Sequence, residues 1–498
     1  MLLDELAAAS ETVAATRSRT AKVAALAEAL GRAGADEVEI AATYLGGAIR
    51  QRRTGVGWRS LSDLPAPADA PTLTLTEVDA ALAHLTTLEG PGSQVARQEA
   101  VADLLGRASA REQQYLAGLI TGALRQGALA GLLVDAIAAA SGVPLPVVRR
   151  AAMLAGSIPG VAVTALTEGE AGLAASTVQV FTPVLPMLAA SAPSVAEALE
   201  KAAPGRPVAI EAKLDGIRIQ AHKRGDEVRL YTRSLDEVTE RFPTVVEAVR
   251  AVDAETLIVD GEALALDGEG RPRLFQDTAS GAAGALVPFF FDALLIDDEP
   301  LIDLPLAERV ERLGERAPVA SMVQRTITNS PAVAEAFTQH VLEQGQEGVV
   351  VKDLAAPYDA GRRGSAWVKV KPVHTLDLVV LAVERGSGRR RGWLSNIHLG
   401  ARDPETGGFV MLGKTFKGMT DEMLRWQTER FTGLKTGEDG WVVNVRPEQV
   451  VEIAFDGLQR STRYPGGLAL RFARVVRYRD DKTAAEADTI ETVRALAR

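Results

Sequence analysis

The string of residues in this chain that is most suggestive of catalysis surrounds one lysine. In Glu211-Ala212-Lys213-Leu214-Asp215-Gly216-Ile217-Arg218, Lys213 follows an apolar strand and precedes a predicted turn. A free lysine amine has a pKa near 10.4, and nearby cations with partial desolvation would lower that pKa and make the amine a nucleophile. Phosphoryl transfer through an enzyme-bound nucleotide needs such a nucleophile, and Arg218 could supply charge and a nucleotide contact. An exposed lysine at the end of a strand could stand in the same string. This string alone therefore does not distinguish a nucleophile from a solvated lysine.

Three further strings could complete a nucleotide site. The strand Leu230-Tyr231-Thr232-Arg233-Ser234 ends in Arg233, which could grip phosphate oxygens, although a solvated arginine is the more frequent case. The apolar run Leu257-Ile258-Val259-Asp260-Gly261-Glu262-Ala263 predicts a strand that presents Glu262 after a glycine turn, suited to ribose hydroxyls, and a hairpin with an exposed glutamate is the alternative. In a chain with only 5% aromatic residues, Phe289-Phe290-Phe291 is conspicuous. A buried strand explains two of these rings, and one could stack on a purine, for which Phe291 is the candidate.

Two later strings add a carboxylate and a pair of lysines. Glu347 opens the apolar run Gly348-Val349-Val350-Val351-Lys352, and a carboxylate oxygen is a ligand that Mg²⁺ prefers. In Trp367-Val368-Lys369-Val370-Lys371, strand alternation puts Lys369 and Lys371 on one face, where they could line a phosphate pocket. A half-exposed strand is the alternative for that alternation.

The elements that carry these strings change along the chain. Residues 1–175 show alanine-rich helical spacing, with one predicted helix from Arg111 to Gln126. Two prolines in Val180 to Pro186 predict an extended linker, and from Pro207 short β-rich runs alternate with helical stretches, which is typical of an α+β region.

A second boundary is predicted near Lys371 to Thr375. Beyond it, alternating strands and turns fit a small β-barrel of the oligonucleotide-binding type, and Thr483 to Arg498 is predicted to be helical. The two proline-containing joints predict a clamp whose parts move relative to one another.

Composition narrows the class of protein. The chain has 498 residues, 47% of them hydrophobic and 24% charged, which is typical of a soluble multidomain protein. It has no cysteine, which excludes disulfides and cysteine-bound zinc. Neither a signal peptide pattern nor an apolar run long enough for a bilayer is present, so the predicted location is the cytoplasm and no membrane partner is expected.

The net charge of −10 argues against a polyanionic partner unless cations are clustered locally. Three such clusters are present, and a solvated surface is the alternative interpretation of each: Arg50, Arg52 and Arg53; Arg389, Arg390 and Arg391; and Arg471, Arg474, Arg477, Arg479 and Lys482.

In this order, the strings resemble the motifs of ATP-dependent DNA ligases of the covalent nucleotidyltransferase superfamily, above all the three-domain bacterial, archaeal and eukaryotic-replicative type. Leu470 to Lys482 is similar to the last motif of that family, with Ala473 where the family often has proline. Arg111 to Leu116 and Gly122 to Gly127 resemble its helical DNA-binding domain, and Val184 to Ala189 resembles the start of its catalytic domain.

The resemblance implies a role for each residue. It implies that Lys213 forms the AMP adduct, that Glu211 reads the adenine amino group, and that Glu347 with Glu262 serves the metal. The other contacts to the nucleotide and its phosphates would come from Arg218, Arg233, Glu262, Phe291, Arg363, Lys369 and Lys371.

Patterns and resemblance together predict a multidomain fold. The expected parts are an all-α DNA-binding domain at 1–175, an α+β nucleotidyltransferase (adenylation) domain at 183–372, a β-barrel OB-fold domain at 376–485 and a C-terminal helical tail at 486–498.

The implied activity is the sealing of nicks in duplex DNA with ATP and Mg²⁺ or Mn²⁺. Lys213 would attack the α-phosphorus of ATP, AMP would pass to the 5′-phosphate, and the 3′-hydroxyl would then displace AMP. The expected partner is nicked duplex DNA held through its phosphates and minor groove, and a monomer is expected because a clamp needs no second copy.

Other activities use similar strings. An mRNA capping guanylyltransferase shares the lysine string, but the helical amino-terminal region and Glu211 speak against it, and the same region disfavours an RNA ligase. A DNA-binding scaffold without catalysis is a third alternative. NAD⁺ is disfavoured as donor, because ligases that use it carry a cysteine-bound zinc module and this chain has no cysteine.

Overall fold

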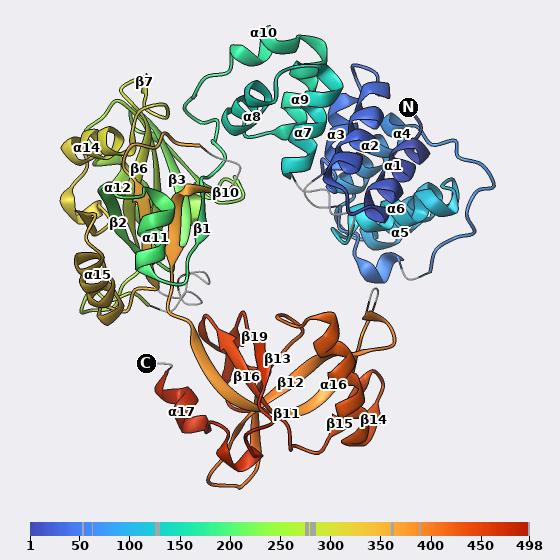
Figure 1. Ribbon diagram of the computed structural model, residues 1–498. Coiled ribbons are helices and arrows are strands. Elements are labelled where there is room, and N and C mark those ends of the chain that lie inside the picture. Colours follow the sequence, from blue (N-terminus) through green and yellow to red (C-terminus); the bar gives the residue numbers. More distant parts are fainter. Residues whose placement is uncertain are drawn as a thin grey trace.

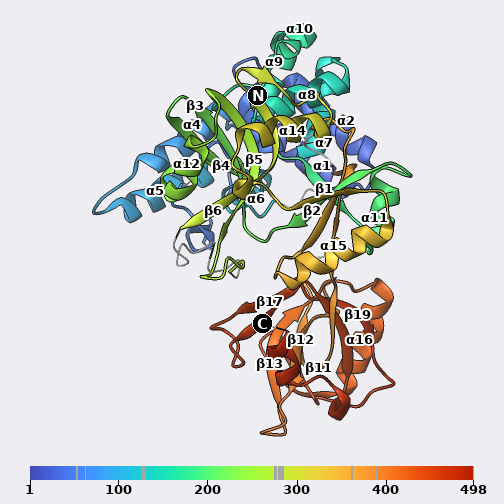
Figure 2. The same cartoon turned by 90° about the vertical axis from the view of Figure 1, so that its left-hand side faces the viewer.

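Three groups of elements follow one another along the chain (Figure 1). The computed structural model describes residues 1–51, 54–61, 63–124, 130–273, 278, 285–359, 363–387 and 390–496. A helical part is followed by a central part with two sheets, and then by a C-terminal part built mainly of strands. The view turned by 90° also shows the C-terminal part next to the central part (Figure 2). Every helix in the described ranges is too short or too polar to span a lipid bilayer.

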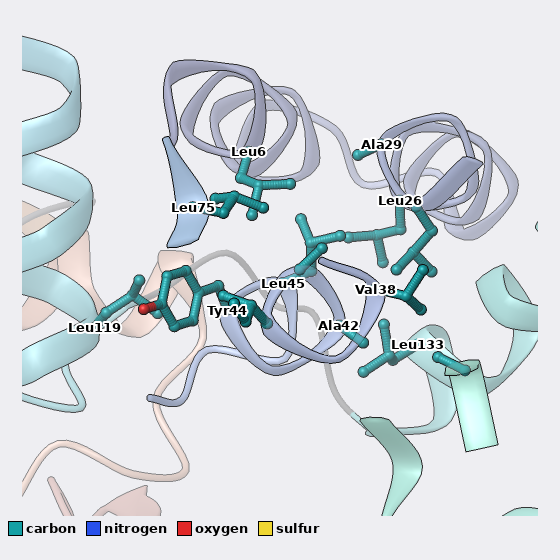
Figure 3. Close-up of a cluster of buried hydrophobic side chains, with 14 of the residues drawn as sticks. Leu6, Leu26, Ala29, Val38, Ala42, Tyr44, Leu45, Leu75, Leu119 and Leu133 are labelled. Carbon is teal, nitrogen blue, oxygen red and sulfur yellow. The ribbon is translucent and has the colours of Figure 1, made fainter. Parts of the chain in front are cut away.

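The helical part is capped and packed by its own sequence. At one helix start, the Ser109 hydroxyl accepts a hydrogen bond from the Glu112 amide, and the Glu112 carboxylate accepts one from the Ser109 amide. Thr74 and Glu77 make the same pair of bonds at another helix start. These bonds satisfy amide groups that the helix leaves unpaired. Figure 3 shows the apolar faces meeting around Leu45. The helices are α1 (Leu3–Ala15), α2 (Arg19–Arg32), α3 (Val38–Leu45), α4 (Leu75–Thr87), α5 (Ser93–Gly106), α6 (Ala110–Ile120), α7 (Ala130–Ser141), α8 (Leu145–Leu154), α9 (Ile158–Thr167) and α10 (Gly169–Ala174), with the 3₁₀ turn η1 (Trp58–Leu61).

Helix α6 is shorter than the sequence predicts. The expected helix from Arg111 to Gln126 ends at Ile120, because the chain turns at Gly122 with a φ of 64° that continues no right-handed helix. The end of that expected helix, with the following Gly127, lies outside the described residues.

The central part consists of two five-stranded sheets with helices beside them. One sheet has the order β1-β10-β9-β2-β8 and the other the order β4-β3-β5-β6-β7. The strands are β1 (Leu188–Ser191), β2 (Val208–Lys213), β3 (Ile217–Arg224), β4 (Glu227–Thr232), β5 (Thr256–Ala265), β6 (Leu286–Ile296), β7 (Glu299–Pro300), β8 (Arg325–Thr328), β9 (Gly348–Asp353) and β10 (Arg363–Val370). The helices are α11 (Val195–Ala202), α12 (Pro243–Arg250), α14 (Leu306–Arg316) and α15 (Pro331–Glu343), with the 3₁₀ turns η2 (Thr239–Arg241) and η3 (Val319–Ser321).

The chain passes from one sheet to the other at the lysine string. Strand β2 ends at Lys213 in the first sheet, and β3 begins at Ile217 in the second. The intervening turn needs Gly216, since a Cβ there would lie 2.4 Å from the Ala263 carbonyl oxygen of β5. This turn therefore fixes Lys213 at the junction of the two sheets.

The C-terminal part forms a seven-stranded sheet and a two-stranded one. Strand β11 pairs with β16 over its first half and with β15 over its second half, while β12 pairs along its other edge. The strands are β11 (His374–Arg385), β12 (Leu394–Arg402), β13 (Phe409–Thr415), β14 (Lys435–Asp439), β15 (Val442–Val445), β16 (Val450–Phe455), β17 (Gly457–Arg460), β18 (Leu468–Arg471) and β19 (Arg474–Tyr478), with α16 (Asp421–Gly433), α17 (Ile490–Ala495) and the 3₁₀ turn η5 (Ala484–Glu486).

The predicted final helix is only partly present. In place of one helix from Thr483 to Arg498, the turn η5 and the short helix α17 are separated by a segment that contains Asp488. The backbone carbonyl of Asp488 accepts from the Arg402 amide at 2.9 Å, and its carboxylate accepts from the Asp377 amide at 2.8 Å. Those bonds to β12 and β11 replace helical ones, and residues 497–498 lie outside the described ranges.

Candidate functional site

A cavity of about 720 Å³ lies between the two central sheets, at the junction that carries Lys213. Its walls come from β1, β2, β9 and β10 on one side and from β3, β5 and β6 on the other. Seven residues predicted from the sequence line it: Glu211, Lys213, Arg218, Arg233, Glu262, Phe291 and Lys369. The fold thus brings together residues that are up to 158 positions apart in the chain, from Glu211 to Lys369.

The Lys213 amine, which lines this cavity, is held by a carboxylate. Its Nζ donates to one Glu347 oxygen, and Lys371 Nζ donates to the other. Burial opposes ionisation of Glu347, but the two lysines outweigh it and hold the pKa of that carboxyl below its usual value. The predicted roles of Glu347 and Lys371 therefore meet at Lys213, although neither residue lines the cavity itself.

A second carboxylate, Glu262, lies opposite Arg218 in the β3–β5 ladder. Burial raises its pKa to about 7, while Lys213 and Arg218 act in the other direction. The expected glycine turn before it is wrong, because Gly261 lies inside β5, where a Cβ would come within 2.8 Å of the Phe289 carbonyl oxygen. Glu262 consequently projects from a continuous strand.

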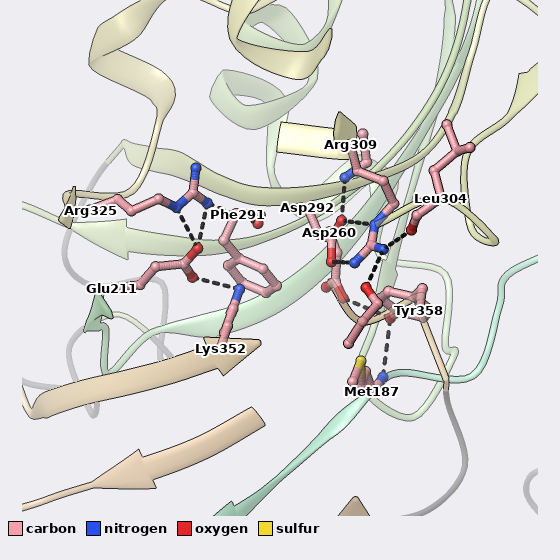
Figure 4. Close-up of polar contacts among 12 residues, drawn as sticks. Met187, Glu211, Asp260, Phe291, Asp292, Leu304, Arg309, Arg325, Lys352 and Tyr358 are labelled. Carbon is pink, nitrogen blue, oxygen red and sulfur yellow. Dashed lines mark hydrogen bonds and ion pairs between the residues drawn. The ribbon is translucent and has the colours of Figure 1, made fainter. Parts of the chain in front are cut away.

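Glu211 lies between two cations (Figure 4). Its side chain is 2% exposed, one oxygen accepts from Arg325, and the other lies 2.5 Å from Lys352 Nζ. Lys352 Nζ also lies 4.4 Å from the Phe291 ring centre and 4.1 Å from the Trp367 ring centre. Burial lowers the pKa of Lys352, and Glu211 opposes that shift. The end of the cavity at Glu211 therefore combines a clamped carboxylate with aromatic faces.

Arg218 is part of the cavity wall. Its guanidinium donates twice to Asp260, at 3.0 and 2.6 Å, and once to the Met187 carbonyl oxygen at 2.7 Å. The same group lies over the rings of Phe291 and Trp367, at 5.6 and 5.7 Å. Its predicted nucleotide contact would therefore be made by a side chain that already has fixed partners.

Two of the remaining predicted residues, Arg233 and Lys369, also line the cavity. Arg233 is exposed in the turn after β4, and Lys369 projects from β10. Arg363 belongs to β10 opposite Leu188, but its side chain lies outside the described part of the chain, as do Arg52, Arg53 and Arg389 of the predicted basic clusters.

Several residues of the site have no role in the sequence-based prediction. Lys352 and Trp367 stand in strings that the sequence singled out, so strand alternation could have pointed to them. Arg325 stands in no such string, and only the pairing of β8 with β2 brings it to Glu211.

The last predicted motif reaches the site from the C-terminal part. Arg471 donates to the Asp215 carboxylate at 2.8 Å, in the turn that follows Lys213. The other cations of that motif are bound by acids within the C-terminal part, since Arg474 pairs with Asp456 and both Arg479 and Lys482 pair with Asp377.

The donor set around Lys213 is compatible with a divalent cation. Glu347 and Glu262 offer hard carboxylate oxygens, and both interact electrostatically with Lys213. Among the described residues, no three acidic or histidine side chains gather into a complete metal-binding group.

Three family models match the chain. They are described as "DNA ligase N terminus" for residues 59–138, "ATP dependent DNA ligase domain" for residues 186–371 and "ATP dependent DNA ligase C terminal region" for residues 390–482.

Curated relatives match over the whole length. A protein of Beutenbergia cavernae named "Probable DNA ligase" is 62% identical, with 100% of each chain covered, and proteins of the same name from Kineococcus radiotolerans and a Nocardioides species are 62% and 60% identical. Both matches cover 100% of this chain. They cover 100% of the Kineococcus radiotolerans protein and 99% of the Nocardioides protein. The solved structure named Pmar-Lig_PreS3 is similar in fold, with a TM-score of 0.63 at 18% identity over 95% of this chain and 99% of its own.

Proposed function

The chain belongs to the family of ATP-dependent DNA ligases, and from that premise we propose that it seals nicks in duplex DNA through an AMP adduct on Lys213. The observation that carries this proposal is the amine of Lys213 at the junction of two sheets, beside a cavity lined by cations, a buried carboxylate and aromatic rings. A nucleotide has a complementary set of groups, with phosphates, an amino group and a flat base.

In the first step, the Lys213 amine attacks the α-phosphorus of ATP. A bond forms between Nζ and phosphorus, the bond from phosphorus to the pyrophosphate oxygen breaks, and the amine loses a proton to solvent. An ammonium has no free electron pair, so Lys213 first has to leave its ion pair with Glu347 and lose one proton to solvent, and the resulting amine loses its second proton as the bond to phosphorus forms. Lys371 donates to the other Glu347 oxygen, so that carboxylate keeps a cationic partner when Lys213 leaves.

The two later steps move the AMP group. An oxygen of the 5′-phosphate at the nick displaces Nζ of Lys213 from phosphorus, and the 3′-hydroxyl then attacks the activated 5′-phosphate and releases AMP. Each step develops charge on phosphorus oxygens, so Arg233, Lys369 and Arg363 are proposed to contact phosphates, and Arg218 to hold the nucleotide from the wall.

Recognition of adenine is proposed for the Glu211 end of the cavity. The Glu211 carboxylate has about four acceptor positions, and Arg325 and Lys352 each approach only one of its oxygens, so an oxygen can still accept from the adenine amino group. Phe291 is the proposed stacking surface for the purine, and its ring stands edge-on to Trp367 at 5.8 Å.

We propose Mg²⁺ or Mn²⁺ as the metal, with Glu347 and Glu262 as its protein ligands. A divalent cation supplies charge neutralisation at the phosphates when it is bound. The protein residues orient the nucleotide, and Lys371 Nζ remains beside Glu347 once Lys213 has moved to phosphorus.

The proposed partner is nicked duplex DNA, bound by one copy of the chain. We assign residues 1–175 to DNA binding, 183–372 to adenylation, 376–485 to an OB-fold domain and 486–498 to a C-terminal tail. The switch of β11 from β16 to β15 supports a barrel, because one strand then serves two edges of a curved sheet. Residence in the cytoplasm stays a prediction from the sequence.

Labelling with ATP tests the proposal. Purified protein incubated with α-³²P-ATP and Mg²⁺ should acquire label, and Lys213→Ala should acquire none, while the exposed-lysine control Lys201→Ala should label like the parent protein. Label from GTP in preference to ATP would indicate a capping guanylyltransferase, and an unlabelled parent protein would indicate a scaffold.

A nick that already carries AMP on its 5′-phosphate separates the steps. Lys213→Ala should seal that substrate, since only the first two steps need its amine. Binding of nicked duplex should weaken steeply with salt, because phosphate contacts release counterions. Failure of the parent protein to seal the pre-adenylylated nick would contradict the proposed last step.

A further inference from the structure

The joint between the helical and central parts is bonded along its length to the central part. We call residues 181–187 the linker strap. Every third residue of the strap, namely Phe181, Val184 and Met187, has both its amide and its carbonyl bound by side chains of the central part. A chain that serves only as a flexible tether would leave these groups to water.

The first two positions are held by β3 and β4. The Phe181 amide donates to His222 Nδ1 at 2.8 Å, and the Tyr231 hydroxyl donates to the Phe181 carbonyl at 3.0 Å. Gln220 binds Val184 at both groups, accepting from its amide at 2.7 Å and donating to its carbonyl at 3.1 Å. Phe181 has a φ of 70°, a conformation that such a residue keeps only when its surroundings enforce it.

The third position lies in the wall of the cavity. The Met187 amide donates to the Tyr358 hydroxyl at 3.1 Å, and Arg218 donates to the Met187 carbonyl at 2.7 Å. Tyr358 in turn donates to Asp260 at 2.8 Å, and Asp260 binds Arg218, so these groups form a closed network (Figure 4 shows its Met187–Tyr358 side). Met187 and Arg218 both line the cavity.

The bonds of the strap are mutually dependent. His222 accepts from Phe181 at Nδ1, so its Nε2 carries the proton and donates to Gln220 Oε1 at 2.9 Å. Arg218, Gln220 and His222 occupy alternate positions of β3 and therefore share one face of it. The three side chains that hold the strap are therefore neighbours on that face.

The helical part is attached to the same strap. The Leu185 amide donates to the Met153 carbonyl of α8 at 2.9 Å. Met153 and Leu154 are buried in one cluster with Val184 and with Ile258 and Leu294 of the second central sheet. Movement of α8 away from the central part would consequently pull on the strap.

We propose that the linker strap couples nucleotide binding to the placement of the helical part, with Gln220 as the positioning residue. The inference rests on the proposed nucleotide site, because Met187 of the strap and its partner Arg218 both line that site. A ligand that binds better when Met187 and Arg218 are in place stabilises the docked strap, and by reciprocity the docked strap strengthens ligand binding.

Gln220→Ala tests the forward direction in the full-length protein. It removes both bonds to Val184 without touching a residue that lines the cavity. The KM for ATP in self-adenylylation should rise at least about fivefold, the lower end of typical coupling between sites, while kcat stays within about twofold. The matched control is Lys223→Met on the opposite face of β3, whose Nζ donates to the Arg250 and Val252 carbonyls, and its KM should equal that of the parent protein.

Hydrogen exchange of the parent protein tests the reverse direction without a variant. Bound ATP should slow exchange of the Phe181, Val184 and Met187 amides at least about fivefold relative to the nucleotide-free protein. Unchanged exchange, or an unchanged KM in a folded Gln220→Ala, would overturn the coupling while leaving lysyl-AMP formation intact. A parent protein that forms no adduct would reject the proposed function and the coupling together.

Discussion

Arg471 of the C-terminal part donates a 2.8 Å hydrogen bond to the carboxylate of Asp215, two residues after Lys213, the proposed nucleophile. Arg471 follows Asp215 by 256 residues in the chain, and its side chain reaches the turn that fixes Lys213 at the junction of the sheets. The C-terminal part therefore contacts the turn beside the proposed nucleotide site in this conformation.

Breaking this bond should slow self-adenylylation. Arg471→Ala removes a charge-assisted hydrogen bond at partly exposed groups, so the rate of adduct formation should fall about tenfold. Sealing of a pre-adenylylated nick should change less, because that reaction needs no attack by Lys213. Arg385→Ala, which breaks an exposed pair with Glu438 in the same part, is the control, and an equal loss there would contradict a specific role for Arg471.

The Glu211 cluster has more positive than negative charge, and this predicts unequal variants. Glu211→Leu leaves Arg325 and Lys352 buried without their carboxylate and should lower the free energy of unfolding by about 3–5 kcal/mol. Lys352→Met leaves Glu211 paired with Arg325 and places a thioether between two rings, so it should cost about 1 kcal/mol or less.

Urea unfolding of the two variants checks this order. Tryptophan fluorescence is a suitable signal, because Trp367 lies in the same cluster. Equal destabilisation by the two substitutions would mean that Lys352, rather than charge balance, dominates the stability of this end of the cavity.

A glycine beside the linker strap should be intolerant of a side chain. Gly156 has a φ of 61°, and a Cβ there would lie 2.6 Å from the Pro183 carbonyl oxygen. Gly156→Ala should lower the free energy of unfolding by about 2–3 kcal/mol, from backbone strain plus the displaced strap. Gly142→Ala has a similar φ of 71° with nothing within 4 Å, and should show only the backbone cost of about 1 kcal/mol. A thermal unfolding series that gave both variants the same cost would disprove contact with the strap.

Acid should undock the strap through His222. Burial lowers the pKa of His222 to about 3, whereas an unfolded histidine titrates near pH 6.5, so the unfolded state binds one more proton between these values. The neutral ring faces the Tyr231 ring at 4.9 Å, the Phe181 amide and Gln220. Its contribution is complete above about pH 6.5 and is lost as the pH falls toward 3, by up to about 1.4 kcal/mol per unit.

His222→Gln, which cannot titrate, provides the comparison for that slope. The free energy of unfolding of the parent protein should fall more steeply between about pH 6 and pH 4 than that of the variant. Parallel curves for the two proteins would show that His222 is protonated without loss of the strap.

The sequence determined which segments form the site and much of their local structure. The strings around Lys213, Glu262, Phe291 and Glu347 predicted strands or strand ends, because apolar runs bounded by glycine and charge have few other structures. Helix ends were less predictable, as in α6, because one glycine in a left-handed conformation ended a periodic pattern early.

Tertiary structure alone decided the partners of those side chains. Arg325 meets Glu211 only because β8 pairs with β2, and Arg218 is fixed to Asp260 and Met187 by the β3–β5 ladder and the strap. The predicted extended linker before the central part is bonded at three places, since an extended segment exposes backbone groups every few residues and the face of β3 offers matching side chains. Local sequence fixes the donors and acceptors, but which of them meet depends on contacts between residues far apart in the chain.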